Sequence, residues 1–206
     1  MQSLAGLLQI AERREKGPSP TFDKAHLMLA FLTIGESGTI GRQALAVRSG
    51  LGEGAVRTVL KKLRDDGYAD ANASGCHLTG TGKRVYRSVR DRLSSTALLE
   101  GSHLTVGFRQ AALAVRGGAE EVRTGIEQRD SAIKVGASGA TTYLMKSGRF
   151  TIPGGSSDCE KDFPSRAWTT LRKELRPGNG DAVILCGADT EVSARVGVVS
   201  AALTLL

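Results

Sequence analysis

Cysteine and histidine are scarce in this sequence, with three of each among 206 residues. Cys76, Cys159 and Cys186 lie far apart, and no Cys-x-x-Cys or mixed Cys/His spacing is present. An odd number of isolated cysteines does not build a disulfide framework, and a structural zinc site needs closely spaced ligands. We therefore expect a reducing, cytoplasmic location and neither a metal nor any other cofactor.

Long apolar runs are missing as well. No stretch approaches 18 uninterrupted apolar residues, and the N-terminus lacks the charged-then-apolar order of a signal peptide. The sequence therefore predicts a protein without a membrane partner. The motifs HExxH, GxSxG, GxGxxG and the phosphate-binding loop are absent too, which favours a protein that is not an enzyme.

The positive charge is unevenly distributed along the chain. The formal net charge is +7, and residues 1–99 hold 15 Lys and Arg against 9 Asp and Glu. Residues 100–206 hold 13 against 12, so the excess lies in the first half. A local basic excess is expected where a protein meets a polyanion.

The most strongly periodic segment runs from Gly52 to Gly67. Its apolar residues recur at i, i+3, i+4 and i+7, the spacing of one buried helix face: Val56, Val59, Leu60 and Leu63. The opposite face is small, hydroxyl-bearing and cationic, and it carries Gly54, Arg57, Thr58, Lys61 and Lys62. A helix of this kind fits the major groove of DNA, although any solvated basic surface helix shares the pattern.

The elements around this basic helix follow a definite order. Helical spacing predicts helices at 4–11, from Asp23 to about Gly38, and over 41–49, with an extended pair at 39–40. A Gly-containing turn at 49–52 leads into the basic helix, and a hairpin over 68–78 with a last helix from 78 follows it. The first helix has one apolar stripe, which suits either a dimer contact or packing against its own domain.

Residues 22–95 resemble a winged helix-turn-helix domain. The resemblance is carried by Leu45-Ala46, Ser49-Gly50-Leu51, Val56-Arg57, Leu60, Leu63, Gly75-Cys76-His77-Leu78-Thr79 and Gly82. In that family the recognition helix enters the major groove and the hairpin, or wing, lies along the backbone or minor groove. The resemblance implies groove contacts from Arg57, Thr58, Lys61 and Lys62, wing contacts from Asn72, Ser74 and His77, and backbone contacts from Arg42 and Gln43. The wing tip holds no Lys or Arg, which weakens its grip on phosphate.

The second half predicts a compact α/β domain of four or five strands and three helices. We expect strands at 105–116, 132–136, 140–145, 150–152 and 182–186, and helices at 119–129, 164–175 and from about 190 to the last residue. The strand at 182–186 is apolar throughout and should be buried on both faces. The fold class is therefore α+β, with an N-terminal winged helix-turn-helix over 1–99 and a small C-terminal α/β domain over 100–206.

Two stretches of this domain could hold a ligand. Glycines and hydroxyls come together at Gly136, Ser138, Gly139, Thr141 and Thr142, and a strand passes into a helix at Asp189 and Thr190. The first stretch equally suits a strand–turn–strand that uses glycine for positive φ. Asp189 could equally be a helix N-cap with a purely structural role.

The pairing of residues 132–142 with a C-terminal Gly-Ala-Asp and an apolar helix resembles an uncharacterised domain of archaeal transcription regulators, where it follows a winged helix. This resemblance implies a cytoplasmic, homodimeric DNA-binding transcription regulator that senses a small-molecule effector and has double-stranded DNA as its partner. One alternative is an enzyme acting on a small phosphorylated or nucleotide substrate, with an accessory winged helix. Another is a scaffold that joins protein partners.

Overall fold

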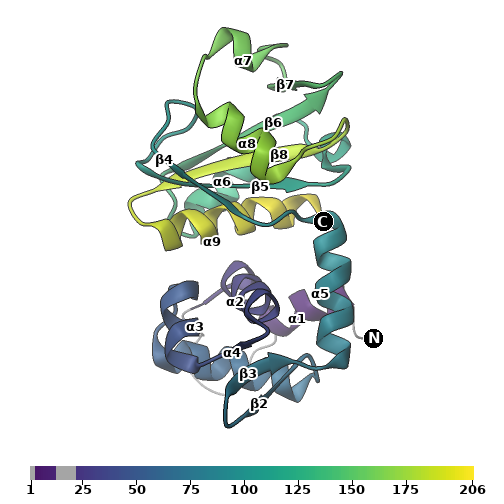
Figure 1. Ribbon diagram of the computed structural model, residues 1–206, viewed down its shortest axis with the longest axis vertical. Helices are drawn as coiled ribbons and strands as arrows, with labels where there is room; N and C mark the ends of the chain where they lie inside the picture. The colour runs from purple at the N-terminus through teal and green to yellow at the C-terminus, as the bar shows by residue number, and fades with distance from the viewer. Residues whose placement is uncertain (1–2, 13–21) are drawn as a thin grey trace. The chain divides into compact units, whose positions relative to one another are not determined.

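The computed structural model describes residues 3–12 and 22–206 (Figure 1). The chain divides into two compact units, Met1–Val89 and Arg90–Leu206. The sequence predicts the domain boundary after residue 99, but the structure has it earlier in the chain. The residues just before 99 belong to the second unit, because they pair with one of its strands. Leu93 forms a bridge with Val115, and β4 (Ala97–Glu100) pairs with β5 (Arg109–Val115). Both units mix helices and strands.

The first unit contains the elements expected for it, in the predicted order. They are α1 (Leu4–Glu12), α2 (Lys24–Ser37), β1 (Thr39–Ile40), α3 (Arg42–Ser49), α4 (Glu53–Asp65), β2 (Ala69–Asn72), β3 (Gly75–Leu78) and α5 (Gly80–Arg92). The three strands form an antiparallel sheet in the order β1-β3-β2. The four apolar residues predicted for the inner face of α4 are all buried.

Local chemistry explains where the helices of this unit begin and end. The Asp23 side chain accepts hydrogen bonds from the N–H groups of Ala25 and His26, which caps α2. Gly50 adopts φ 69° after α3, a left-handed conformation that glycine takes without strain. In α3 only Leu45 is an apolar anchor, because Val47 is 72% exposed.

Helix α1 packs against its own unit. Leu7 and Ile10 are buried, and α1 contacts both α2 and α4. The Lys62 ammonium donates a hydrogen bond of 2.9 Å to the carbonyl of Ile10. Of the two roles considered for this helix, packing within the unit is the one the contacts support. The Gly/Pro segment expected to end it, residues 17–20, lies outside the described residues.

The second unit is built around an antiparallel sheet of five strands. Besides β4 and β5, its elements are η1 (Gly118–Glu121), α6 (Ile126–Lys134), β6 (Gly139–Lys146), β7 (Arg149–Thr151), α7 (Cys159–Asp162), α8 (Ala167–Leu175), β8 (Ala182–Ala188), α9 (Glu191–Ala202) and η2 (Leu203–Leu205). The strand order is β4-β5-β8-β6-β7. Helix α8 lies on one face and α6 with α9 on the other (Figure 1). Every residue of β8 is buried, as predicted.

Two expected elements of this unit are wrong, and a third begins later than expected. The helix predicted at 119–129 and the strand predicted at 132–136 are replaced by the short turn η1 and by helix α6, which begins after Gly125. The buried residues of α6 are Gln128 and Ala132, whereas the apolar Ile133 is 46% exposed. The prediction of a strand here is wrong because it treated Ile133 as a buried residue. The strand predicted from Thr105 begins at Arg109, because the residues before it form a loop folded onto the sheet.

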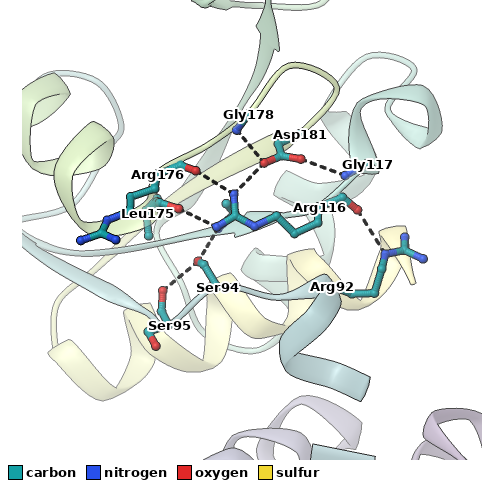
Figure 2. A network of polar contacts seen from close by, with 10 residues as sticks. Arg92, Ser94, Ser95, Arg116, Gly117, Leu175, Arg176, Gly178 and Asp181 are labelled. Atoms are coloured by element: carbon teal, nitrogen blue, oxygen red, sulfur yellow. Dashed lines mark hydrogen bonds and ion pairs between the residues drawn. The ribbon is translucent and has the colours of Figure 1, made fainter. Parts of the chain in front are cut away.

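A buried carboxylate ties β5 and β8 to the end of α8 (Figure 2). Asp181 accepts hydrogen bonds from the N–H groups of Gly117 and Gly178, at 3.0 and 2.8 Å, and from the Arg116 guanidinium at 2.7 Å. The same guanidinium donates to two carbonyl groups at the end of α8, at 3.0 and 2.8 Å. Burial alone would raise the pKa of Asp181, but these donors outweigh it and hold the pKa below its usual value.

Replacing Asp181 with asparagine should lower the free energy of unfolding by about 2 kcal/mol at pH 7, since hydrogen bonds to a buried charge are lost. The folded-state pKa lies below the unfolded one, so the carboxylate stabilises fully above about pH 4 and loses its effect as the pH falls through the folded value. The difference between D181N and the wild type should therefore shrink below about pH 4 in urea titrations. A difference independent of pH, or equal to that of the exposed Asp130→Asn control, would contradict this account.

Candidate functional site

A groove of about 1060 Å³ lies between α4 and the β2–β3 hairpin in the first unit. Its cationic lining residues are Arg42, Arg57, Lys61 and Arg64. The last three stand at i, i+4 and i+7 on α4, so they share one helix face that is turned toward the hairpin. Asn72 and Ser74 also line the groove, from the hairpin.

Two carboxylates share this groove with the four cations. Lys61 Nζ lies 3.4 Å from Asp65, one helical turn away on α4, and Arg64 Nε lies 3.7 Å from Asp70 on β2. Arg42 and Arg57 have no ion pair with any residue that the structure describes. The groove therefore keeps a positive excess, which is concentrated at the end nearest α3.

A smaller hollow of about 360 Å³ adjoins the groove at the first turns of α3 and α4. Arg42 and Arg57 line both spaces, and Gln43 and Glu53 line only the smaller one. The N-cap residues of the two helices are glycines without a side-chain capping bond. Side chains therefore leave the first N–H groups of both helices available to other acceptors.

The exposed front of α4 is open at its first turns. A Cβ atom on Gly54 would have no heavy atom within 4 Å, and the Thr58 hydroxyl donates a bond of 3.1 Å to the Gly54 carbonyl. The oxygen of Thr58 can still accept a hydrogen bond. At the hairpin tip, Asn72 Oδ1 accepts from the Ser74 N–H at 2.9 Å, which fixes the turn.

Four of the residues implied as DNA contacts do not line the groove: Gln43 lines only the smaller hollow, Thr58 lies on the front of α4 outside the groove, and Lys62 and His77 lie elsewhere. Lys62 is only 5% exposed, and its ammonium is bound to the Ile10 carbonyl, so it serves the packing of α1. His77 lies on the middle strand of the sheet, opposite Thr39 and Asp70, and does not line the groove. Conversely, Arg64 was missed, although its spacing of three residues from Lys61 is visible in the sequence.

The second unit has a hollow of about 330 Å³ at one end of its sheet. Three of the residues expected to bind a ligand line it, namely Ser138, Gly139 and Thr141. His103 and Arg129 line it as well and supply groups that can donate hydrogen bonds to an anion. The register of β6 and β8 sets Gly139 opposite Gly187, so the two expected stretches approach each other at this end.

The glycines at this end let the loop over 101–108 lie directly on the sheet. A Cβ atom on Gly187 would stand 1.7 Å from the Val106 carbonyl oxygen, and one on Gly139 would stand 2.7 Å from the Val106 side chain. The Thr141 hydroxyl donates to the Leu104 carbonyl at 3.0 Å. Gly139 and Thr141 therefore have structural roles in seating the loop, while Ser138 is exposed beside the hollow.

The four remaining expected ligand residues lie outside this hollow. Gly136 follows α6 with φ 94°, and Thr142 is buried in β6. Thr190, rather than Asp189, is the N-cap of α9, and its hydroxyl accepts from the Ser193 N–H at 3.1 Å. Asp189 is exposed next to that cap.

The loop over 101–108 is held by one buried amide. Gln110 is 2% exposed, and its Oε1 accepts from the backbone N–H and the hydroxyl of Ser102 at 3.1 and 2.7 Å. Its Nε2 donates to the carbonyl groups of Ser102, Thr105 and Gly107 at 2.8, 3.3 and 3.0 Å. Gln110 therefore positions the loop that bounds the second-unit hollow.

We expect Gln110→Leu to lower the free energy of unfolding by about 2–3 kcal/mol, because it leaves loop carbonyl and N–H groups without their partner. Amide exchange of residues 102–107 should accelerate in the same variant. Gln128→Leu is the matched control, since this equally buried glutamine makes one described side-chain bond, to Thr204. Equal losses in the two variants would show that Gln110 does not anchor the loop.

A comparison with known proteins finds a family model that matches most of the second unit. Residues 106–205 match a family model. Its description is "Domain of unknown function (DUF4443)". Among solved structures, the chain is similar to the hypothetical protein PH0730 from Pyrococcus horikoshii OT3, with a TM-score of 0.71 and 24% sequence identity. That similarity covers 88% of this chain and 91% of the other, and at this identity it shows a common fold alone.

The comparison with curated proteins suggests no activity for this chain. No curated protein matches the sequence. In the part of the chain that the structure describes, no group of three or more His, Cys, Asp or Glu side chains is arranged to hold a metal ion. None of the helices described is both long and apolar enough to cross a membrane.

Proposed function

We propose that residues 22–95 form a winged helix-turn-helix that binds double-stranded DNA, as the reading module of a transcription regulator. The observation that carries the proposal is the groove between α4 and the hairpin, where Arg42, Arg57, Lys61 and Arg64 gather. A phosphate backbone needs such a row of cations, and the open first turns of α4 suit contact with base edges. The Gly54 and Thr58 surface would then read sequence while the arginines position the duplex.

Fluorescence anisotropy with labelled duplexes at 50–200 mM salt tests this proposal. Phosphate contacts from Arg42 and Arg57 alone predict a slope of log affinity against log salt of about −2, and contacts from all four cations predict a slope of about −4. Binding should also be lost when the duplex is replaced by a neutral polymer of similar length. Affinity that does not respond to ionic strength would contradict the proposal.

We further propose that the protein acts as a homodimer. Two copies of α4 spaced about one DNA turn apart, roughly 34 Å, would read two half-sites. Light scattering of the free protein and of its complex with DNA gives the stoichiometry directly. A single copy bound per duplex at saturation would contradict this part of the proposal.

For the second unit we propose the sensing of a small-molecule effector in the hollow lined by His103, Arg129 and Ser138. These groups favour a small ligand that carries an anionic or hydroxyl group. Native mass spectrometry of the purified protein can detect such a ligand. If the ligand is an effector, it must change the affinity of the protein for DNA by the same factor by which DNA changes the affinity of the protein for the ligand. Chemical conversion of the ligand would instead support an enzyme.

A further inference from the structure

The groove of the first unit has two electrostatically different ends. At the end nearest α3, Arg42 and Arg57 have no ion pair with a described residue. At the hairpin end, Lys61 faces Asp65 and Arg64 faces Asp70, at 3.4 and 3.7 Å. All four paired side chains are between 57% and 60% exposed, so an incoming polyanion can reach them.

We propose that Asp65 and Asp70 limit the affinity of this groove, so that duplex DNA of arbitrary sequence is bound only weakly. The inference rests on the DNA-binding function proposed above and concerns the same surface. Each carboxylate forms an ion pair with a cation that could otherwise bind a DNA phosphate. Each carboxylate also repels that phosphate, because both groups are negatively charged. Non-specific binding depends almost entirely on such phosphate contacts, so the two carboxylates directly lower the affinity for an arbitrary duplex.

Each of the two carboxylates has a local contact that favours its position beside the groove. Asp70 Oδ1 accepts a hydrogen bond of 2.8 Å from the Ala71 N–H, within strand β2. Asp65 lies on the last turn of α4, four residues after Lys61, where helix geometry keeps the pair adjacent. A duplex that enters the groove meets this repulsion whatever its sequence, and favourable base contacts along α4 are what would offset it.

Asp65→Asn and Asp70→Asn test the inference on the full chain. Asparagine keeps the size of the side chain and an oxygen that can accept the Ala71 N–H bond, so we expect thermal unfolding to change little. With a random-sequence duplex at 100 mM salt, each variant should bind about 3–10-fold more tightly than the wild type. The salt slope should become steeper by up to about 0.9 for each cation released.

Asp91→Asn is the matched control, because it removes the same charge from an exposed residue that does not line the groove. Asp70→Ser serves as a second variant if Asp70→Asn folds poorly. A wild type that binds in a salt-dependent way, with variants no tighter than the control, would overturn this inference alone. Failure of the wild type and all variants to bind any duplex would overturn the proposed function and this inference with it. Weaker binding by the variants would show that the carboxylates position Lys61 and Arg64 for DNA, which also overturns it.

Discussion

Replacing both Arg42 and Arg57 with alanine should weaken binding of duplex DNA by about 100-fold. Two lost phosphate contacts of about 1.4 kcal/mol each correspond to this factor, and the salt slope should fall by about 2. The effect should exceed that of Lys61→Ala with Arg64→Ala, because each of those two cations is already paired with its own carboxylate, Asp65 or Asp70. Anisotropy titrations at several salt concentrations measure both the affinity and the slope.

The double arginine variant should fold normally. Arg42 and Arg57 are exposed and make no ion pair with a described residue, so truncating them leaves no buried group without a partner. Lys134→Ala with Lys146→Ala is the matched control, since it removes the same charge from exposed positions of the second unit. If the control weakens binding as much as the arginine pair does, the groove is not the DNA surface.

Gly187→Ala should be the most destabilising single substitution considered, lowering the free energy of unfolding by about 3 kcal/mol or more. The added Cβ would stand 1.7 Å from the Val106 carbonyl oxygen and 2.8 Å from its carbonyl carbon. Both are backbone atoms of a loop that Gln110 already holds with several hydrogen bonds, so the contact cannot relax cheaply. Urea unfolding and amide exchange of residues 101–108 would measure the loss.

Gly178→Ala is the control for that substitution. The nearest atom to its added Cβ would be an Asp181 carboxylate oxygen at 3.8 Å, which is ordinary contact, and its φ is not in the left-handed region. We expect the free energy of unfolding of the Gly178→Ala variant to lie within about 1 kcal/mol of the wild type. Alanine restricts the unfolded chain more than glycine does, which offsets small losses in the folded state. Similar losses in both variants would mean that the close approach of loop and sheet does not limit stability.

The first unit could be predicted from the sequence in some detail, because its signals are local. Helical spacing located the buried side of α4, and glycines marked the turn before that helix and the stop after it. In the second unit the same reasoning failed at α6, whose exposed Ile126 and Ile133 look like inward residues. Only the packing of α6 against α9 determines which side of α6 is buried, and a spacing rule does not contain that contact.

The candidate sites show the same division. The cationic stripe of α4 follows from helix periodicity, but the burial of Lys62 depends on α1, a helix fifty residues earlier in the chain. Gly139 and Thr141 suggested a ligand, and instead they accommodate a loop from a distant part of the sequence. Residue types therefore indicated the chemistry of each region, whereas long-range packing decided which side chains remain available.

The central place of β8 has a consequence for synthesis on the ribosome. Strands β5 and β6 do not pair with each other, since each pairs with β8, the last strand of the sheet to be translated. Until β8 has been synthesised, the apolar strands β5 and β6 lack their main hydrogen-bonding partner. Their unpaired edges make this intermediate prone to aggregation. A translational pause just before Ala182 would prolong that vulnerable interval, whereas a pause shortly after the first unit has emerged would not.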